Sequence, residues 1–131
     1  MTNVEFVTRA YRHVISQEEQ CTIPSVGSEE PICLYAGSNG NACAIGVFLP
    51  REVAEALDEA EQGMPWQTVL QRATHDANAR IAADCLAGVD ADLAGNVQGA
   101  HDFVDTRDAE GIRQLRRMFA PLLYRAKRLD R

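Results

Sequence analysis

Hydrophobic residues recur every three or four positions along most of this 131-residue chain, which is the spacing of one buried helix face. The first such segment opens with a capping box, in which Thr2 is the N-cap and Glu5 follows three residues later. Asp90 is a good N-cap for a later helix, and Pro121 should kink or break the last one. The pattern predicts helices over about residues 3–17, 52–61, 65–86 (one helix or two), 91–104 and 108–126.

Residues 32–48 are the one strand-like stretch in this helical pattern. Residues 32–35 and 42–48 are apolar runs that contain aromatic and β-branched residues. Between them, residues 37–41 read Gly-Ser-Asn-Gly-Asn, and Gly and Asn tolerate the positive φ that tight turns require. The stretch therefore predicts a β-hairpin.

Two registers of this hairpin are open. A turn centred on residues 38–39 places Cys33 opposite Ile45, on the same face as Cys43. A two-residue turn one position later shifts the register by one and places Cys33 opposite Gly46. Because a lone hairpin is marginally stable in water, helices should cover it in either register.

Composition is that of an ordinary globular protein, with 46% hydrophobic and 24% charged residues. No apolar run approaches the roughly 18 residues of a membrane span, and the first residues lack the basic and apolar regions of a signal peptide. We therefore expect a cytoplasmic protein with reduced cysteines. The expected fold is α+β but predominantly α-helical, with five or six helices packed around one small hairpin (about 32–48) in a single domain over residues 1–131.

The net charge of −6 is spread unevenly. Residues 113–131 hold seven basic residues and one acidic residue, whereas residues 1–112 hold six basic and 18 acidic residues. One interpretation is that the basic last helix neutralises the acidic body and suits the C-terminal end of a helix dipole. The other is that the charges form a contact surface for a partner.

Two charged helix faces are candidate binding surfaces. The helix over 52–61 presents an acidic face, which is either solvated or binds a basic partner; its residues are Glu52, Glu55, Asp58 and Glu59. The last helix carries Arg113, Arg116 and Arg117 at helical spacing, which is an alternative basic surface for DNA. We do not expect direct nucleic-acid binding, because the acidic body repels phosphate.

Residues that could carry chemistry are few. Cys33 and Cys43 lack the close spacing of structural zinc ligands and fit core packing better. His101-Asp102 follows Gln98 by one turn and resembles a general base, but no partner nucleophile or phosphate-binding loop is recognisable. A structural role for His101 in fixing the hairpin is the simpler hypothesis. We therefore expect no enzyme activity, metal or cofactor.

A set of short matches lies at residues 33–37, 39–40, 43–46 and 49–50, with looser ones at Ser16-Gln17 and at Gln98-x-x-His101-Asp102. They resemble small uncharacterised phage and prophage proteins that share the pattern C-x-Y-x-G-x-x-G-x-x-C-A-x-G-x-x-I-P. This chain differs from these proteins in having Ala36 where Arg would be expected, and Phe48-Leu49 in place of Leu-Ile. The resemblance implies an accessory protein of a mobile element in a bacterial host cell, without an implied activity.

The leading hypothesis is a non-enzymatic accessory protein that binds a host protein through its acidic face. Such a partner would be a basic nucleic-acid-binding complex, and the protein would act as an inhibitor of a host defence system such as CRISPR. One alternative is a regulatory or DNA-associated module that uses the basic last helix. A second is a small-ligand binder or hydrolase at His101-Asp102. A homodimer is compatible with all three.

Overall fold

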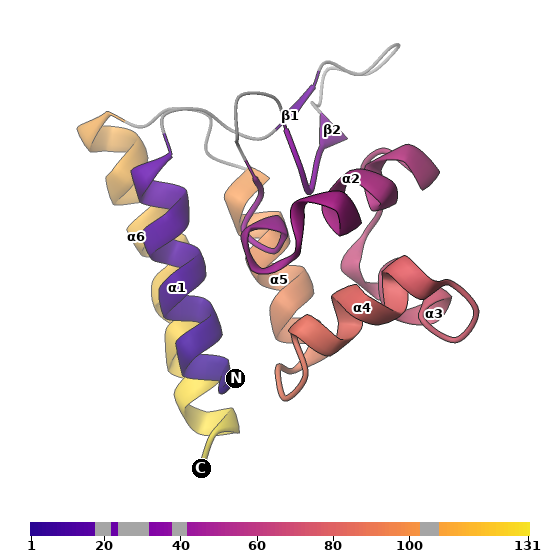
Figure 1. The fold of residues 1–131 in the computed structure, drawn as a ribbon. Helices are drawn as coiled ribbons and strands as arrows, with labels where there is room; N and C mark the ends of the chain where they lie inside the picture. The colour runs from indigo at the N-terminus through magenta and orange to yellow at the C-terminus, as the bar shows by residue number, and fades with distance from the viewer. Residues whose placement is uncertain (18–21, 24–31, 38–41, 103–107) are drawn as a thin grey trace.

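In the computed structural model, residues 1–17, 22–23, 32–37, 42–102 and 108–131 are described. Within these ranges the chain forms six α-helices, one short 3-10 helix and two strands of two residues each (Figure 1). The elements are, in order, α1 (Asn3–Ser16), β1 (Thr22–Ile23), β2 (Ile32–Cys33), η2 (Gly46–Phe48), α2 (Arg51–Ala60), α3 (Trp66–Arg72), α4 (Ala77–Cys85), α5 (Ala91–Asp102) and α6 (Ala109–Leu129). The prediction of a predominantly helical fold is confirmed.

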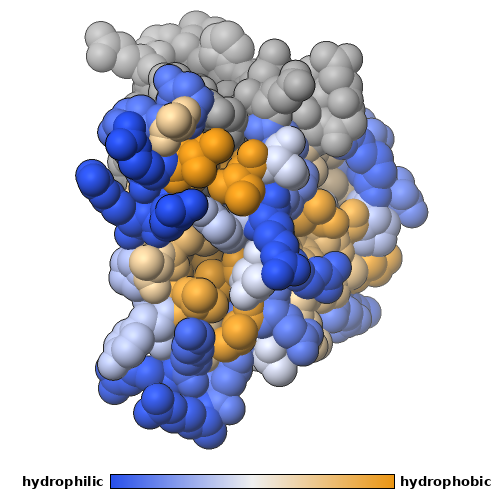
Figure 2. All heavy atoms as spheres, turned by 90° about the vertical axis from the view of Figure 1, so that its left-hand side faces the viewer, coloured by the Kyte–Doolittle hydropathy of each residue, from blue (hydrophilic) through white to orange (hydrophobic). Residues whose placement is uncertain are grey.

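The helices form two groups that meet at α5. Helices α1 and α6 lie side by side and antiparallel, so that the two chain ends lie at the same end of the pair (Figure 1). Helix α5 packs against both of them on one side and against α3 on the other, and α4 joins α3 to α2. Seen from the α1–α6 side, apolar surface is visible between hydrophilic side chains (Figure 2).

Local capping signals set most helix starts. The Thr2 Oγ1 accepts a hydrogen bond from the Glu5 N–H at 3.1 Å, and Asp90 Oδ1 accepts one from the Leu93 N–H at 2.9 Å. Asp108 caps α6 in the same way, by accepting from the Gly111 N–H. Each cap satisfies one of the N–H groups that a helix start leaves without an intrahelical partner. The predicted starts of α1, α5 and α6 are therefore confirmed.

Two helix boundaries could not be settled from the apolar pattern alone, namely the one within residues 65–86 and the one at Pro121. The apolar pattern over 65–86 is divided into α3 and α4, because Asp76 caps a new helix by accepting from the N–H groups of Asn78 and Ala79. Helix α6 continues through Pro121 without a break. Pro121 lacks the N–H of one intrahelical bond, but α6 is anchored by residues buried on both sides of that position, Phe119 before it and Ala126 after it.

Asn3 and Asp130 join three elements near the chain ends. The Asp130 carboxylate accepts hydrogen bonds from the Asn3 N–H, the Asn3 side-chain amide and the Val4 N–H, at 2.9 to 3.0 Å. The Asn3 side-chain oxygen accepts from the Asp90 N–H at 2.7 Å. The last turn of α6 thus caps the first turn of α1, and α1 holds the start of α5.

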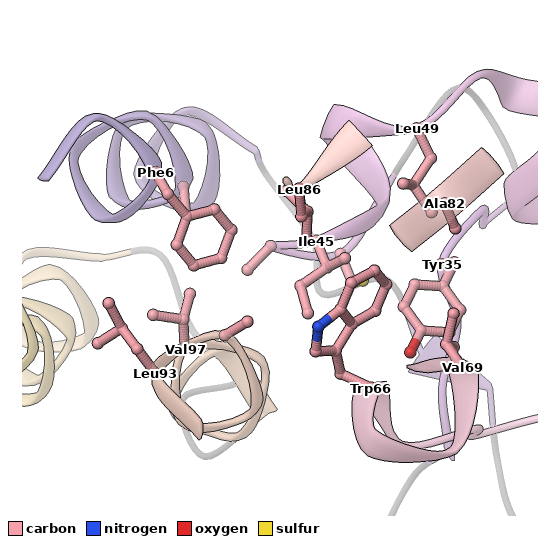
Figure 3. Close-up of a cluster of buried hydrophobic side chains, with 14 of the residues drawn as sticks. Phe6, Tyr35, Ile45, Leu49, Trp66, Val69, Ala82, Leu86, Leu93 and Val97 are labelled. Atoms are coloured by element: carbon pink, nitrogen blue, oxygen red, sulfur yellow. The ribbon is translucent and has the colours of Figure 1, made fainter. Parts of the chain in front are cut away.

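The hydrophobic core is centred on Trp66, which is 2% exposed. Its ring lies between Val97 on α5 and the ring of Tyr35 (Figure 3). The Trp66 backbone N–H donates to Gln98 Oε1 at 3.1 Å, and the Tyr35 hydroxyl donates to the Met64 carbonyl at 2.7 Å. Both bonds satisfy polar groups that the core would otherwise leave without partners.

The predicted hairpin over residues 32–48 is not seen in the described residues, and residues 38–41 of its predicted turn lie outside them. β2 pairs with β1 instead, with Thr22 opposite Cys33. Of the expected second strand, the described residues show only a single antiparallel bridge, between Ala36 and Ala42. This bridge fits the first of the two predicted registers, but the ladder does not continue beyond it.

The chain leaves strand geometry after Ala42 because three consecutive residues, 43–45, are fully buried. A strand turns successive side chains to opposite faces, so three neighbours point into one core only if the backbone curls. The Val47 N–H bonds to the Cys43 carbonyl, and η2 follows. A Cβ on Gly46 would lie 1.9 Å from the Tyr35 carbonyl oxygen, so only glycine allows this close backbone contact.

Candidate protein-binding surfaces

The four predicted acidic residues all lie on α2, but they have different partners. Glu52 and Glu59 are exposed, and no ion pair joins either of them to another residue that the structure describes. Glu55 is exposed and pairs with Arg51 one turn before it, at 3.1 Å. Asp58 is only partly exposed and makes backbone hydrogen bonds.

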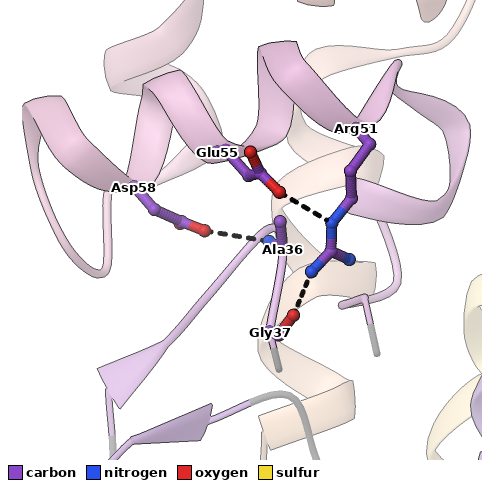
Figure 4. Close-up of polar contacts among 5 residues, drawn as sticks. All are labelled: Ala36, Gly37, Arg51, Glu55 and Asp58. Atoms are coloured by element: carbon purple, nitrogen blue, oxygen red, sulfur yellow. Dashed lines mark hydrogen bonds and ion pairs between the residues drawn. The ribbon is translucent and has the colours of Figure 1, made fainter. Parts of the chain in front are cut away.

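Asp58 holds the segment that follows β2 against α2 (Figure 4). Its two carboxylate oxygens accept from the N–H groups of Tyr35 and Ala36, each at 2.9 Å. Arg51 donates to the Gly37 carbonyl on the same segment. Burial raises the pKa of Asp58 above its ordinary value, although the two N–H bonds and Arg51 act in the opposite direction. Asp58 is thus a structural residue, and the part of the acidic face free to bind a partner is Glu52 and Glu59.

Charge is separated between the two groups of helices. Residues 42–102, which include α2 to α5, hold ten acidic and three basic residues. Residues 1–17 and 108–131, which include α1 and α6, together hold nine basic and four acidic residues. Helices α1 and α6 lie on one side of the molecule and α2, α3 and α4 on the other, with α5 between them (Figure 1). The described residues of these two groups therefore carry net charges of +5 for the α1–α6 group and −7 for the α2–α5 group.

The basic side consists mainly of α6, and its arginines are not equivalent. Arg113 pairs with Glu110 at 2.8 Å, and Arg125 lies 3.7 Å from Asp90. Arg116 and Arg117 are exposed and form no ion pair with the described residues. Of the three predicted basic residues, Arg116 and Arg117 are therefore available to a partner.

Sequence patterns did not predict an open groove of about 190 Å³ between α1 and α6. Its lining is almost wholly apolar and consists of Val7, Thr8, Tyr11, Arg116, Phe119, Ala120 and Leu123. The rings of Tyr11 and Phe119 are 5.2 Å apart and join the two helices across its floor. The apolar spacing on both helices indicated burial, so only the packed pair shows that some of these positions face a hollow.

Among the cysteine, glutamine and histidine candidates, only Cys43 and Gln98 have side chains that the structure describes, and both make structural contacts. Cys43 is a fully buried thiol whose sulfur accepts from the Gly46 N–H at 3.2 Å. Gln98 caps α3 through Trp66. The side chains of Cys33, His101 and Asp102 lie outside the described residues. In the ranges that the structure describes, no group of three His, Cys, Asp or Glu side chains could hold a metal ion.

His13 performs the type of contact that was expected of His101. Its Nε2 lies 2.8 Å from the Ala42 carbonyl oxygen, and Gln17 Oε1 accepts from the Ala42 N–H at 3.0 Å. An open hollow of about 200 Å³ lies beside them and is lined by His13, Tyr35, Ala36, Ala42, Gly46, Val47, Leu49, Arg51 and Ala54. Its three ionisable side chains, His13, Tyr35 and Arg51, already bond backbone carbonyls, so the described lining residues offer no free acid–base group.

Across the described helices, none is both long and apolar enough to cross a membrane. Comparisons with protein-family models, with curated proteins and with solved structures give no match to this chain.

Proposed function

We propose that this protein is a non-enzymatic accessory protein of a phage or other mobile element that acts by binding a host protein. Its acidic side, centred on Glu52 and Glu59 of α2, engages a basic surface on that partner. The observation that carries the proposal is the separation of charge, which leaves a net −7 on residues 42–102. A basic nucleic-acid-binding complex, such as a CRISPR defence complex, is the partner class that this surface suits.

The geometry of α2 supports this role. Val53, Ala54 and Leu57 are buried and fix the helix against the core, so Glu52 and Glu59 project from a rigid element. They are seven residues apart, which corresponds to about 10 Å along a helix. Arginines that bind phosphate groups also form two-point hydrogen bonds with carboxylates. A partner surface built for nucleic acid can therefore accept these side chains.

The experiment is an affinity capture from a bacterial lysate with nuclease, comparing the wild-type chain with the double variant Glu52→Lys, Glu59→Lys. We expect one stoichiometric basic partner that is retained after nuclease treatment and released at high salt. The double variant should bind it at least about tenfold more weakly, because two attractive contacts become repulsive. Asp58 stays unchanged in this design, since it supports the fold.

The matched control is the double variant Asp84→Lys, Asp92→Lys. It makes the same change in net charge at two exposed acidic residues on α4 and α5. The control should weaken binding less than about threefold, because it leaves the α2 contacts in place. Equal losses in both variants would reduce the effect to net charge and contradict a site on α2. Recovery of nucleic acid that depends on Arg116 and Arg117 would instead identify α6 as the binding surface.

A further inference from the structure

The groove between α1 and α6 is a second surface that the proposed function does not use. Val7 and Phe119 are 1% and 3% exposed and form its floor. Thr8 on α1 and Ala120 on α6 stand at its edges, and Leu123 extends it along α6. The side view of this helix pair shows apolar surface between hydrophilic side chains (Figure 2). Filling such a groove removes apolar surface from water, which favours binding.

The shape of the groove suits a helix. Two antiparallel helices packed side by side leave a furrow along each face of the pair, and a third helix fits such a furrow by ridge-into-groove packing. Helix α5 packs against both α1 and α6 inside the molecule. The groove is lined by residues of the same two helices, and an incoming helix would pack there as α5 packs within the core.

The charged side chains at the edges of the groove indicate what kind of helix it would bind. Arg116 lines the groove itself. Arg12 follows Thr8 by one turn along α1, and Lys127 follows Leu123 by one turn along α6. None of these three cations forms an ion pair with another described residue. Glu5, one turn before Thr8, is the one acidic side chain at a neighbouring helical position, so the edges remain net positive.

We propose that this groove binds an amphipathic helix of another protein, with large aliphatic residues one turn apart on one face and Asp or Glu on the flanks. The aliphatic residues enter the groove over Val7 and Phe119, and the flanking carboxylates pair with Arg116, Arg12 and Lys127. This site is independent of the acidic face of α2, since it lies on the other group of helices and has the opposite charge.

The test uses two designed helical peptides as probes. The first has Leu at positions i, i+4 and i+7 with Glu at the flanking positions, and the second is identical except that Lys replaces each Glu. Binding of each labelled peptide to the full chain is followed by fluorescence anisotropy. The Glu peptide should bind at least about tenfold more tightly than the Lys peptide, and its affinity should fall as salt increases.

Two groove variants and one control variant test whether the peptide binds in the groove. Arg116→Glu reverses the charge at its edge and should weaken binding of the Glu peptide about tenfold. Arg117→Glu is the matched control, because it makes the same charge change on the next residue of α6, which does not line the groove; it should change affinity less than about twofold. Ala120 is an exposed residue of the groove lining, so Ala120→Glu puts a negative charge into the groove without altering a buried side chain. This variant should abolish binding of the Glu peptide. Circular dichroism and thermal melting confirm that each variant is folded.

The proposal is overturned if neither peptide binds, if the Lys peptide binds as well as the Glu peptide, or if Arg117→Glu acts as strongly as Arg116→Glu. Light scattering of the chain alone tests whether a second copy of the chain occupies the groove instead. A dimer that dissociates in the Ala120→Glu variant would show that a second copy fills the groove, and would likewise overturn the assignment.

Discussion

Two carboxylates of this protein satisfy backbone N–H groups that would otherwise lack partners. Asp58 accepts from Tyr35 and Ala36, and Asp130 accepts from Asn3 and Val4. In both cases the bond joins segments that are distant in sequence. Hydrogen bonds to a charged acceptor contribute more to stability than neutral ones, so these two residues should matter more than the incomplete burial of Asp58 and the exposure of Asp130 suggest.

Replacing Asp58 by Asn should lower the free energy of unfolding by about 1–3 kcal/mol. An amide has one acceptor oxygen, so only one of the two N–H groups keeps its partner, and the NH₂ group faces the other. Urea denaturation measures the loss from the shift in midpoint. Glu59→Gln is the control, because Glu59 is exposed on the same helix, and its effect should stay within about 0.5 kcal/mol. Equal stability of the two variants would show that the Asp58 bonds contribute nothing.

Asp130 should make stability depend on pH. Hydrogen bonds from the Val4 N–H and from Asn3 hold the pKa of Asp130 below its ordinary value of 3.8. The ionised form is therefore favoured in the folded state, so its contribution is present above pH 3.8 and is lost as pH falls through the lowered folded pKa. Asp130→Asn should melt below the wild type at pH 7.

Melting temperatures of the wild type and Asp130→Asn over a pH series show the direction in which Asp130 changes stability with pH. As pH falls below 3.8, the wild-type carboxyl becomes neutral and loses its advantage, so the difference in melting temperature between the two proteins should shrink. Comparing the two proteins at each pH removes the contributions of other groups, including Asp58, whose raised pKa acts in the opposite direction. A difference that stays constant down to pH 2 would contradict the assignment.

At the scale of elements, the helices could be predicted because their signals are local. The caps at Thr2 and Asp90 act on N–H groups three residues away, and each apolar stripe repeats within one helix. The same logic identifies the break between α3 and α4, since Asp76 is followed by three residues with no bulky apolar side chain. The longer apolar pattern over residues 65–86 left one helix and two helices as alternatives, and the cap at Asp76 decides for two.

The stretch after Ala42 could not be predicted in this way, because its conformation depends on contacts distant in sequence. Its composition favours a strand, yet burial of residues 43–45 in succession requires a curled backbone. Gly46 is needed for contact with the Tyr35 backbone rather than for a turn. β1 and β2 pair over two residues each, which is too short for an alternating pattern to show.

Two glycine substitutions should therefore have opposite effects. Gly46→Ala should destabilise the protein by about 1–3 kcal/mol, because its Cβ would overlap backbone atoms of Tyr35 that have no room to move. Gly99→Ala in α5 should stabilise it by about 0.5–1 kcal/mol, since beyond the adjoining backbone of α5 no atom of the described residues lies within 4 Å of the added Cβ, and alanine favours helix. Chemical denaturation of both variants gives the comparison. A stable Gly46→Ala protein would contradict the close contact.

At the scale of the whole molecule, charge separation was visible in the sequence, but its arrangement was not. The acidic body and basic last helix follow from counting residues. The structure adds that α1 joins α6 on the basic side and that Asp58 supports the fold. The α1–α6 groove depends on how two helices meet, which no single apolar pattern specifies. The acidic and basic surfaces could therefore be predicted from the sequence. Which of their residues remain available to bind a partner could not be predicted.

The opposite charges of the two sides lead to a prediction for the ionic-strength dependence of binding. A partner held by Glu52 and Glu59 should dissociate as salt rises, because exposed ion pairs are screened over about 8 Å at physiological ionic strength. The Glu52→Lys, Glu59→Lys variant should show weak binding with little remaining salt dependence. Titration of the isolated complex with sodium chloride measures both slopes. Identical slopes for the wild type and the variant would contradict an electrostatic contact through α2.

Carboxylate labelling of the isolated complex, read by mass spectrometry, tests the binding site on α2 most directly. The reagent modifies exposed Asp and Glu side chains, and the uncomplexed chain provides the reference. We predict that partner binding protects Glu52 and Glu59, while Asp84 and Asp92 on the neighbouring helices are labelled as before. Unchanged labelling at Glu52 and Glu59 in a stoichiometric complex would contradict the proposal that the acidic face of α2 binds the partner.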